Sequence, residues 1–184
     1  DLRQLPLLVE MEVKRQEELL KIRDELKKIT MPSFQVIDVS SLFVNSAANV
    51  IKNTLAKKGT VLAMRLPGFA GFIGREVQPG RRLGTEFSDR AKVRAGVGGI
   101  FHSDELPRYG ISENEVAQVK ARLECKSGDA FVLVADTERK THLALEAVYE
   151  RAQQVLKGVP AEVRKANAEG TTTYLRPIPG AARM

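Results

Sequence analysis

One apolar run constrains the fold of this chain more than any other feature. Residues 130–135 read AFVLVA, without a charged or amide side chain. A short run of this kind, bounded by polar residues and rich in β-branched and aromatic side chains, is typical of a buried strand. Residues 60–66 (TVLAMRL) form a second predicted strand, with Val61 and Ala63 opposed to Leu62 and Met64. The fold is therefore expected to be built around a sheet.

Helical patterns alternate with these strands. The longest covers residues 6–29, where Pro6 suits a first helical turn. Its apolar residues recur on one stripe: Leu19, Ile22, Leu26 and Ile29. The other predicted helices start at Asn45 or Ser46, at Thr85, at a Ser112–Glu115 capping box and at Asp136. Short strands are expected over 34–39 and 100–101, and a hairpin-like pair around Gly170.

This order of elements predicts an α+β fold, because strands and helices interleave without a dinucleotide-binding turn. We expect a two-layer sandwich, with helices on one face of a mainly antiparallel sheet and an amphipathic helix at the N-terminus. The chain divides into residues 1–32 (helix and linker), 33–160 (the main domain) and 161–184 (a return segment).

Composition narrows the class of protein. With 184 residues, 43% of them hydrophobic, the chain is long enough to bury a core without a metal or a disulfide. The single cysteine, Cys125, suits a reducing compartment, so a cytoplasmic location is expected. No run approaches the ~20 apolar residues of a membrane span. The chain lacks an initiator methionine, which suggests an excised segment. The net charge of +6 makes RNA a reasonable partner.

Residues 67–99 form a long excursion that is rich in glycine and arginine, and segments of this length are often functional. The run LPGFAGFIG resembles a phosphate-binding loop, but no Gly-Lys-Ser or Gly-Lys-Thr ends it and the G-x-G-x-x-G spacing is missing. Tight turns with Phe69 and Phe72 pointing inward are the preferred interpretation.

His102, Asp104 and Glu105 form the one His-carboxylate cluster of the sequence. A metal site would need further ligands, and His142 and Cys125 lie on other segments. A loop histidine that caps its own backbone is the preferred interpretation. No serine, threonine or cysteine is paired by motif with a base, so no nucleophilic site is predicted. No catalytic residue is therefore assigned within the chain.

A basic run is the strongest binding signal. Six basic residues lie within twenty positions: Arg75, Arg81, Arg82, Arg90, Lys92 and Arg94. Guanidinium groups match the geometry of phosphate oxygens, so the run could contact an RNA backbone or a protein partner. The alternative is a solvated face balanced by Glu76, Glu86 and Asp89. If about four of the six met phosphates, log K against log salt would have a slope near about −3.

Two resemblances give these features a context. Residues 60–158 resemble the insertion domain of bacterial aspartyl-tRNA synthetases, on the segments TVLAMRLPGFA, GVGGIFHSDELPRYGIS and SGDAFVLVADTERKTHLALEAVYERAQQVL. Nearly the whole chain resembles the E-type subunit of archaeal Glu-tRNA(Gln) amidotransferases. The segments DLRQLPLLVEMEVKRQEELLKIRDELKK and TTTYLRPIPGAARM carry that second resemblance, which is the closer one.

The resemblance implies a parent ligase that phosphorylates the glutamate of Glu-tRNA(Gln) with ATP and Mg²⁺ and then amidates it. Its implied partners are a glutaminase subunit and tRNA(Gln), with neither DNA nor membrane. In this family the chemistry belongs to a separate cradle domain, to which residues 1–32 and 161–184 would connect. Arg183 matches an arginine at the rim of the cradle's active site.

The favoured interpretation is thus an accessory, non-catalytic domain that contacts tRNA or the partner subunit. By itself it is expected to need no cofactor, to hydrolyse no ATP and to amidate no Glu-tRNA(Gln). The alternatives are the insertion domain of an aspartyl-tRNA synthetase and a free-standing RNA-binding module.

Overall fold

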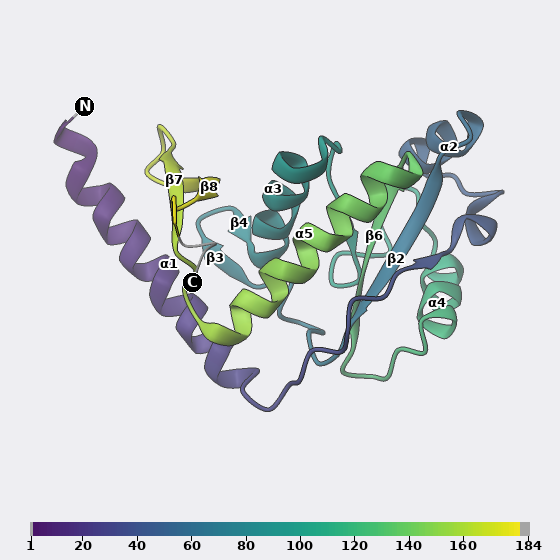
Figure 1. Ribbon diagram of the computed structural model, residues 1–184, viewed down its shortest axis with the longest axis horizontal. Coiled ribbons are helices and arrows are strands. Elements are labelled where there is room, and N and C mark those ends of the chain that lie inside the picture. The colour runs from purple at the N-terminus through teal and green to yellow at the C-terminus, as the bar shows by residue number, and fades with distance from the viewer. Residues whose placement is uncertain (1, 181–184) are drawn as a thin grey trace.

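A four-stranded antiparallel sheet forms the centre of the protein (Figure 1). The structure, a computed structural model, describes residues 2–180. The strand order is β1 (Ile37–Asp38), β2 (Thr60–Leu66), β6 (Ala130–Asp136) and β5 (Phe101–His102). The two strands predicted as buried, β2 and β6, are paired over their full length, from Thr60 opposite Asp136 to Leu66 opposite Ala130. Both are buried almost throughout, which confirms the sheet inferred from their sequences.

Long helices cover one face of this sheet. Helix α5 (Glu138–Lys157) crosses β2 and β6, and α3 (Leu83–Ala95) packs beside it (Figure 1). Alternate strand residues, including Leu62, Met64 and Val132, point into this layer and form one hydrophobic cluster with both helices. The second half of α1 (Leu5–Glu25) closes the same cluster with Leu19 and Ile22.

The opposite face of the sheet is also covered, which corrects the two-layer prediction. There α2 (Asn49–Ala56), α4 (Glu113–Arg122) and the 3₁₀ turn η2 (Ser40–Phe43) pack on the alternate residues of β2 and β6. Strand β6 is apolar on both faces, so both faces need cover. The α+β class and the antiparallel sheet are confirmed, and the helices form two layers with the sheet between them.

Two hairpins complete the fold beside α1. Strands β3 (Glu76–Gln78) and β4 (Arg81–Arg82) form one, and β7 (Glu162–Ala166) and β8 (Thr172–Pro177) form the other. The second hairpin was predicted around Gly170, and the first was not. A short 3₁₀ turn, η1 (Leu2–Gln4), precedes α1. The division at residues 32 and 160 stays a prediction, although both flanking segments contact the main domain.

Element ends follow local hydrogen bonds. The Ser112–Glu115 capping box is confirmed, because each residue's backbone N–H donates to the other's side chain at 2.9 and 3.1 Å. Helix α5 starts one residue later than predicted, with Thr137 as its cap in place of Asp136. Three predicted elements are shorter than expected: the N-terminal helix, the helix before Lys57 and the strand over 34–39.

Among residues 2–180, no helix has the length and apolar character to cross a membrane.

Candidate functional site

Four of the six predicted basic residues make ion pairs within the protein. Arg75 binds Glu18 at 2.6 Å and also Glu25, both on α1. Arg81 binds Asp89 at 2.6 Å. Arg90 binds Glu162 of β7 and lies 3.9 Å from the centre of the Tyr174 ring, and Arg94 binds Glu150 of α5. These four arginines hold neighbouring elements to one another, so they do not form one free basic patch.

The other two basic residues, Arg82 and Lys92, are exposed and have no ion pair within residues 2–180. Arg82 lies at the junction of β4 and α3, and Lys92 lies in the last turns of α3. Of the acids proposed to balance the run, Asp89 does pair with Arg81. Glu76 makes no ion pair among the described residues, and Glu86 binds arginines from distant segments.

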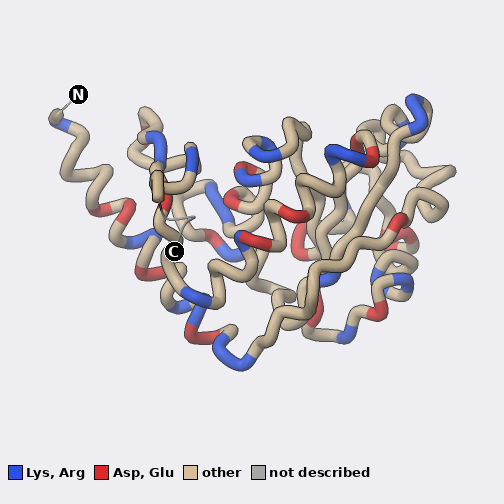
Figure 2. The backbone as a smooth tube through the Cα atoms, in the orientation of Figure 1, with Lys and Arg blue, Asp and Glu red and all other residues tan. Residues whose placement is uncertain are grey.

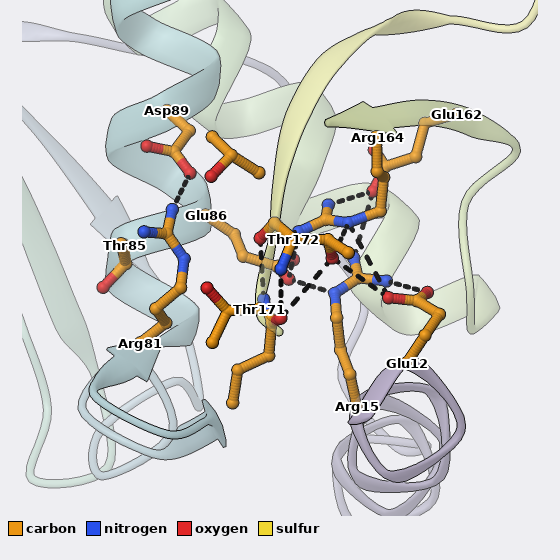
Figure 3. A network of polar contacts seen from close by, with 12 residues as sticks. Glu12, Arg15, Arg81, Thr85, Glu86, Asp89, Glu162, Arg164, Thr171 and Thr172 are labelled. Atoms are coloured by element: carbon orange, nitrogen blue, oxygen red, sulfur yellow. Dashed lines mark hydrogen bonds and ion pairs between the residues drawn. The ribbon is translucent and has the colours of Figure 1, made fainter. Parts of the chain in front are cut away.

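Glu86 is the centre of a buried ion network that joins the flanking segments to the core (Figure 3). One carboxylate oxygen accepts from Arg15 of α1 at 2.6 Å, and the other accepts from Arg151 of α5 at 2.6 Å. Arg15 also reaches Glu162 of β7 at 3.0 Å. Arg164 continues the network, binding Glu162 at 2.6 Å and the hydroxyl of Thr172 at 2.7 Å. Helix α1 and the β7–β8 hairpin are thereby fixed to α3 and α5.

The electrostatics of the network favour an ionised Glu86. Burial on its own would raise the pKa of Glu86, but Arg151 and Arg15 outweigh it and lower that pKa to about 2. Burial lowers the pKa of Arg151, whose Nε and Nη1 have no hydrogen-bond partner among the described residues. The network therefore depends on Glu86 as the shared counter-charge of two buried arginines.

A cavity of about 440 Å³ opens between α3 and the edge of the central sheet. Glycines form part of its wall: Gly98 and Gly99 precede β5, and Gly84 lies at the start of α3. Aromatic and aliphatic side chains supply the apolar part of the wall: Val50, Ile100, Phe101, Tyr109 and Ala135. Polar side chains converge on the same space: Arg82, Thr85, Ser88, His102 and Glu105. Apolar walls with a few convergent polar groups are typical of ligand pockets.

His102 lies in β5 and borders this cavity, which corrects the prediction of a histidine that caps its own backbone. Its ring is buried, and its Nε2 is 3.7 Å from a carboxylate oxygen of Glu105. Nδ1 has no hydrogen-bond partner among the described residues. Burial lowers the pKa of His102, and Glu105 and Asp104 act in the opposite direction. The ring is therefore predominantly neutral at pH 7.

The residues around His102 have different structural roles. Asp104 accepts hydrogen bonds from the backbone of Gly71 and Gly74, both at 2.9 Å, so it holds the glycine-rich turn in place. Gly84 leaves room for the His102 ring, since a Cβ there would lie 2.6 Å from Nε2. Phe69 is fully buried and Phe72 packs on the same core, as predicted for tight turns. Within residues 2–180, no group of three His, Cys, Asp or Glu residues is placed to hold a metal.

The remaining predicted site residue, Arg183, lies outside the described residues. Two buried arginines of the ion network, Arg15 and Arg151, were not among the residues predicted from the sequence. A signal was available for both. Arg15 lies four positions before Leu19 on the apolar stripe of α1, and Arg151 lies between Val148 and Val155 on the buried stripe of α5. A charged residue at a core position of a helix indicates a buried counter-charge elsewhere in the chain.

Comparison with known families accounts for the central part of this architecture. The GAD domain family matches residues 51–145, a little more than half of the chain. The chain belongs to the GAD domain family. The matched residues include β2, β6, α3, α4 and every residue that lines the cavity except Val50.

The GAD-containing chain is also similar to curated archaeal proteins over nearly all of its length. It is 55% identical over 186 residues to the E-type subunit of the glutamyl-tRNA(Gln) amidotransferase of Methanocaldococcus jannaschii. It is 52% and 51% identical to the proteins of the same name from Methanosarcina barkeri and Pyrococcus abyssi. These matches cover 96–100% of the chain and 28–30% of the relatives. The chain thus spans less than a third of their length, and the predicted relationship to this amidotransferase subunit is confirmed.

Proposed function

We propose that this chain is an accessory, non-catalytic unit of an ATP-dependent amidotransferase that converts Glu-tRNA(Gln) to Gln-tRNA(Gln). One observation carries the proposal: the whole chain, not only its GAD residues, is similar to part of the E-type subunit. Similarity in the segments that flank residues 51–145 favours the amidotransferase over an aspartyl-tRNA synthetase. The parent's partners would be a glutaminase subunit and tRNA(Gln), its ATP and Mg²⁺ would bind elsewhere, and its location would be cytoplasmic.

The buried ion network supports a structural role for this unit. Its main carboxylates, Glu86 and Glu162, each bind two or more guanidinium groups, so their oxygens are occupied in holding segments together. Such a network makes α1, the GAD core and the β7–β8 hairpin one body. A rigid body of this kind suits a unit that keeps a binding surface at a fixed place within a larger enzyme.

Helix α1 supplies a surface through which this unit would meet the rest of the parent protein. Its second half is buried on the core, but its first half exposes apolar side chains: Leu5, Leu7, Val9 and Val13. The helix projects beyond the core at this end (Figure 1). Exposed apolar side chains that gather on one element are typical of an interaction surface.

An assay with the two-subunit enzyme tests the proposal. The 184-residue chain, given Glu-tRNA(Gln), ATP, Mg²⁺ and ammonium chloride, is expected to form neither ADP nor Gln-tRNA(Gln). The complete enzyme forms both under the same conditions. Gln-tRNA(Gln) formed by the highly purified chain would contradict the non-catalytic assignment.

A second arm tests the surface of α1. Replacing Leu5 and Val9 by serine in the full-length parent protein should impair its folding or its assembly, as measured by size-exclusion chromatography. The same pair in the 184-residue chain should leave its unfolding midpoint nearly unchanged, because both side chains are exposed there. Unchanged folding and assembly of the full-length variant would argue against docking through α1.

A free-standing RNA-binding module is the second candidate. It is favoured by Arg82 and Lys92, the two members of the basic run that make no ion pair among the described residues. Figure 2 shows that basic residues are spread over the molecule and interleave with acidic ones. Any RNA contact would therefore be local, and it would depend on a few residues at one place.

A further inference from the structure

We propose that the cavity between α3 and β5 is a binding site for one unstacked nucleotide of an RNA strand, with its base inside and its phosphate at Arg82 and Lys92. This inference deepens the proposed function and rests on it, because it names the place and the chemistry of an RNA contact. Three independent observations support it: where the uncommitted cations lie, what the cavity wall is made of, and which buried polar atom lacks a partner.

The first observation is the position of the two uncommitted cations. Four of the six basic residues in the run are neutralised by acids on α1, α3, α5 and β7. Arg82 lines the cavity directly. The Cε of Lys92 comes within 3.9 Å of the Cβ position of Gly99, which also lines it. The two cations of the run that make no ion pair among the described residues thus border the same opening, which fits an anionic ligand.

The second observation is the wall of the cavity. The rings of Phe101 and Tyr109 lie 5.9 Å apart and are tilted by 52°, and both border the space. Tyr109 is half-exposed, so part of its ring is open to a base that enters from solvent, beside the Arg108 guanidinium carbon that lies 5.2 Å from the ring centre. No atom outside Gly98 and its chain neighbours lies within 4 Å of its Cβ position, so a flat ring can approach the backbone there. Unpaired bases are recognised by stacking on aromatic side chains, whereas bases in a duplex are not accessible.

The third observation is the unmet hydrogen bonding at the cavity. His102 is 95% buried, and its Nδ1 has no partner among the described residues. A buried polar atom without a partner is costly, and a ligand group or its bound water would supply one. Glu105 adds an acceptor, and Ser88 and Thr85 add hydroxyl groups. The edge of a nucleobase carries both donors and acceptors, so it can use this mixed set.

Fluorescence anisotropy with the 184-residue chain tests this site. The probe is a fluorescein-labelled single-stranded oligoadenylate of six nucleotides, titrated from low to moderate salt. Unlabelled AMP serves as competitor, and a blunt RNA duplex is the comparison. The expected result is salt-sensitive binding of the single strand, competition by millimolar AMP, and weaker binding of a duplex that carries the same number of phosphates.

Two variants probe the two halves of the site. Tyr109→Ala should weaken binding of the strand about tenfold, the effect of losing a stacked base. Arg82→Ala with Lys92→Ala should weaken binding and should reduce the slope of log K against log salt by about 1.4, the share of two phosphates. All three side chains are exposed, so the variants should fold, and circular dichroism checks this. If Tyr109→Ala does not fold, the Arg82→Ala, Lys92→Ala double variant still tests the site by its affinity and its salt dependence.

A matched control removes the same charge elsewhere. Lys27→Ala with Lys28→Ala changes two exposed lysines in the turn that follows α1, and neither lines the cavity between α3 and β5. This pair should change affinity less than twofold. Equal weakening by the control and the cavity pair, or no effect of either cavity variant, would overturn the nucleotide site. The accessory role would survive that result, because the amidation assay tests it separately.

Discussion

Helix α3 has two sides that use basic residues in opposite ways. On the side of α1 and α5, every arginine meets a carboxylate: Arg15 and Arg151 share Glu86, and Arg90 binds Glu162. On the side of the cavity, Arg82 and Lys92 make no ion pair among the described residues, and Lys92 acts on Asp89 only through its charge. Basic residues that are close in sequence therefore need not form one binding surface. Within a few residues, one cation stabilises the fold and the next is free for a ligand.

The largest expected effect comes from breaking the paired side. Glu86→Gln keeps the shape of the side chain but leaves Arg15 and Arg151 without their shared counter-charge. Removing one partner of a buried ion pair typically costs about 3–5 kcal/mol. We expect the free energy of unfolding in urea to fall by about that amount.

Glu17→Gln is the matched control for this change. Glu17 is exposed in the middle of α1 and makes no ion pair within residues 2–180, so its substitution should cost less than about 0.5 kcal/mol. A loss below about 1 kcal/mol for Glu86→Gln would mean that packing, and not charge, holds the network together.

Acid should weaken the same side of α3 without any mutation. The pKa of Glu86 is about 2 in the folded protein, against 4.5 for a glutamate without these contacts. Because the folded pKa is the lower one, the contribution of Glu86 to stability is complete above pH 4.5 and is lost as the pH falls towards 2. This loss amounts to about 3 kcal/mol.

Urea unfolding at several pH values between about 5 and about 2 measures this dependence. Other carboxylates contribute to the acid response, so the informative quantity is the difference between the wild type and Glu86→Gln. That difference should shrink as the pH falls. A difference that stays constant across the whole range would contradict the assignment of the low pKa to Glu86.

The contrast between the two sides of α3 also explains what the sequence could predict. Strands β2 and β6, the cap at Ser112 and the buried stripe of α1 follow from local patterns, because each depends on residues a few positions apart. The acidic partners of the buried arginines do not follow from local patterns. Arg15 meets Glu86 across 71 positions and Glu162 across 147, and no local pattern encodes such pairs.

The same reasoning applies to the cavity. Its residues come from α2, β4, α3, the 98–105 segment, Tyr109 and β6, and they meet only once β5 pairs with β6 at the edge of the sheet. The sequence indicated that the glycine-rich excursion was functional, and it named Arg82 and Lys92 among six basic candidates. It could not separate those two from the four that are paired, because the acids that bind the four lie on α1, α3, α5 and β7.

The second helical layer was missed for a related reason, since α2 and α4 are short and their burial depends on tertiary contacts.

Arg81 and Arg82 offer the sharpest test of the contrast, because adjacent residues of one type fall on opposite sides of it. Arg81 binds Asp89 at 2.6 Å with both side chains largely buried, so Arg81→Ala should lower the free energy of unfolding by about 1 kcal/mol. Arg82→Ala should lower it by less than about 0.5 kcal/mol. Binding of the single-stranded oligoadenylate should respond in the reverse order, several-fold weaker for Arg82→Ala and nearly unchanged for Arg81→Ala. The two measurements are independent. The two variants must therefore rank in one order for stability and in the opposite order for binding. If both variants shift stability and binding together, the two sides of α3 are not separate, and the basic run acts as one surface.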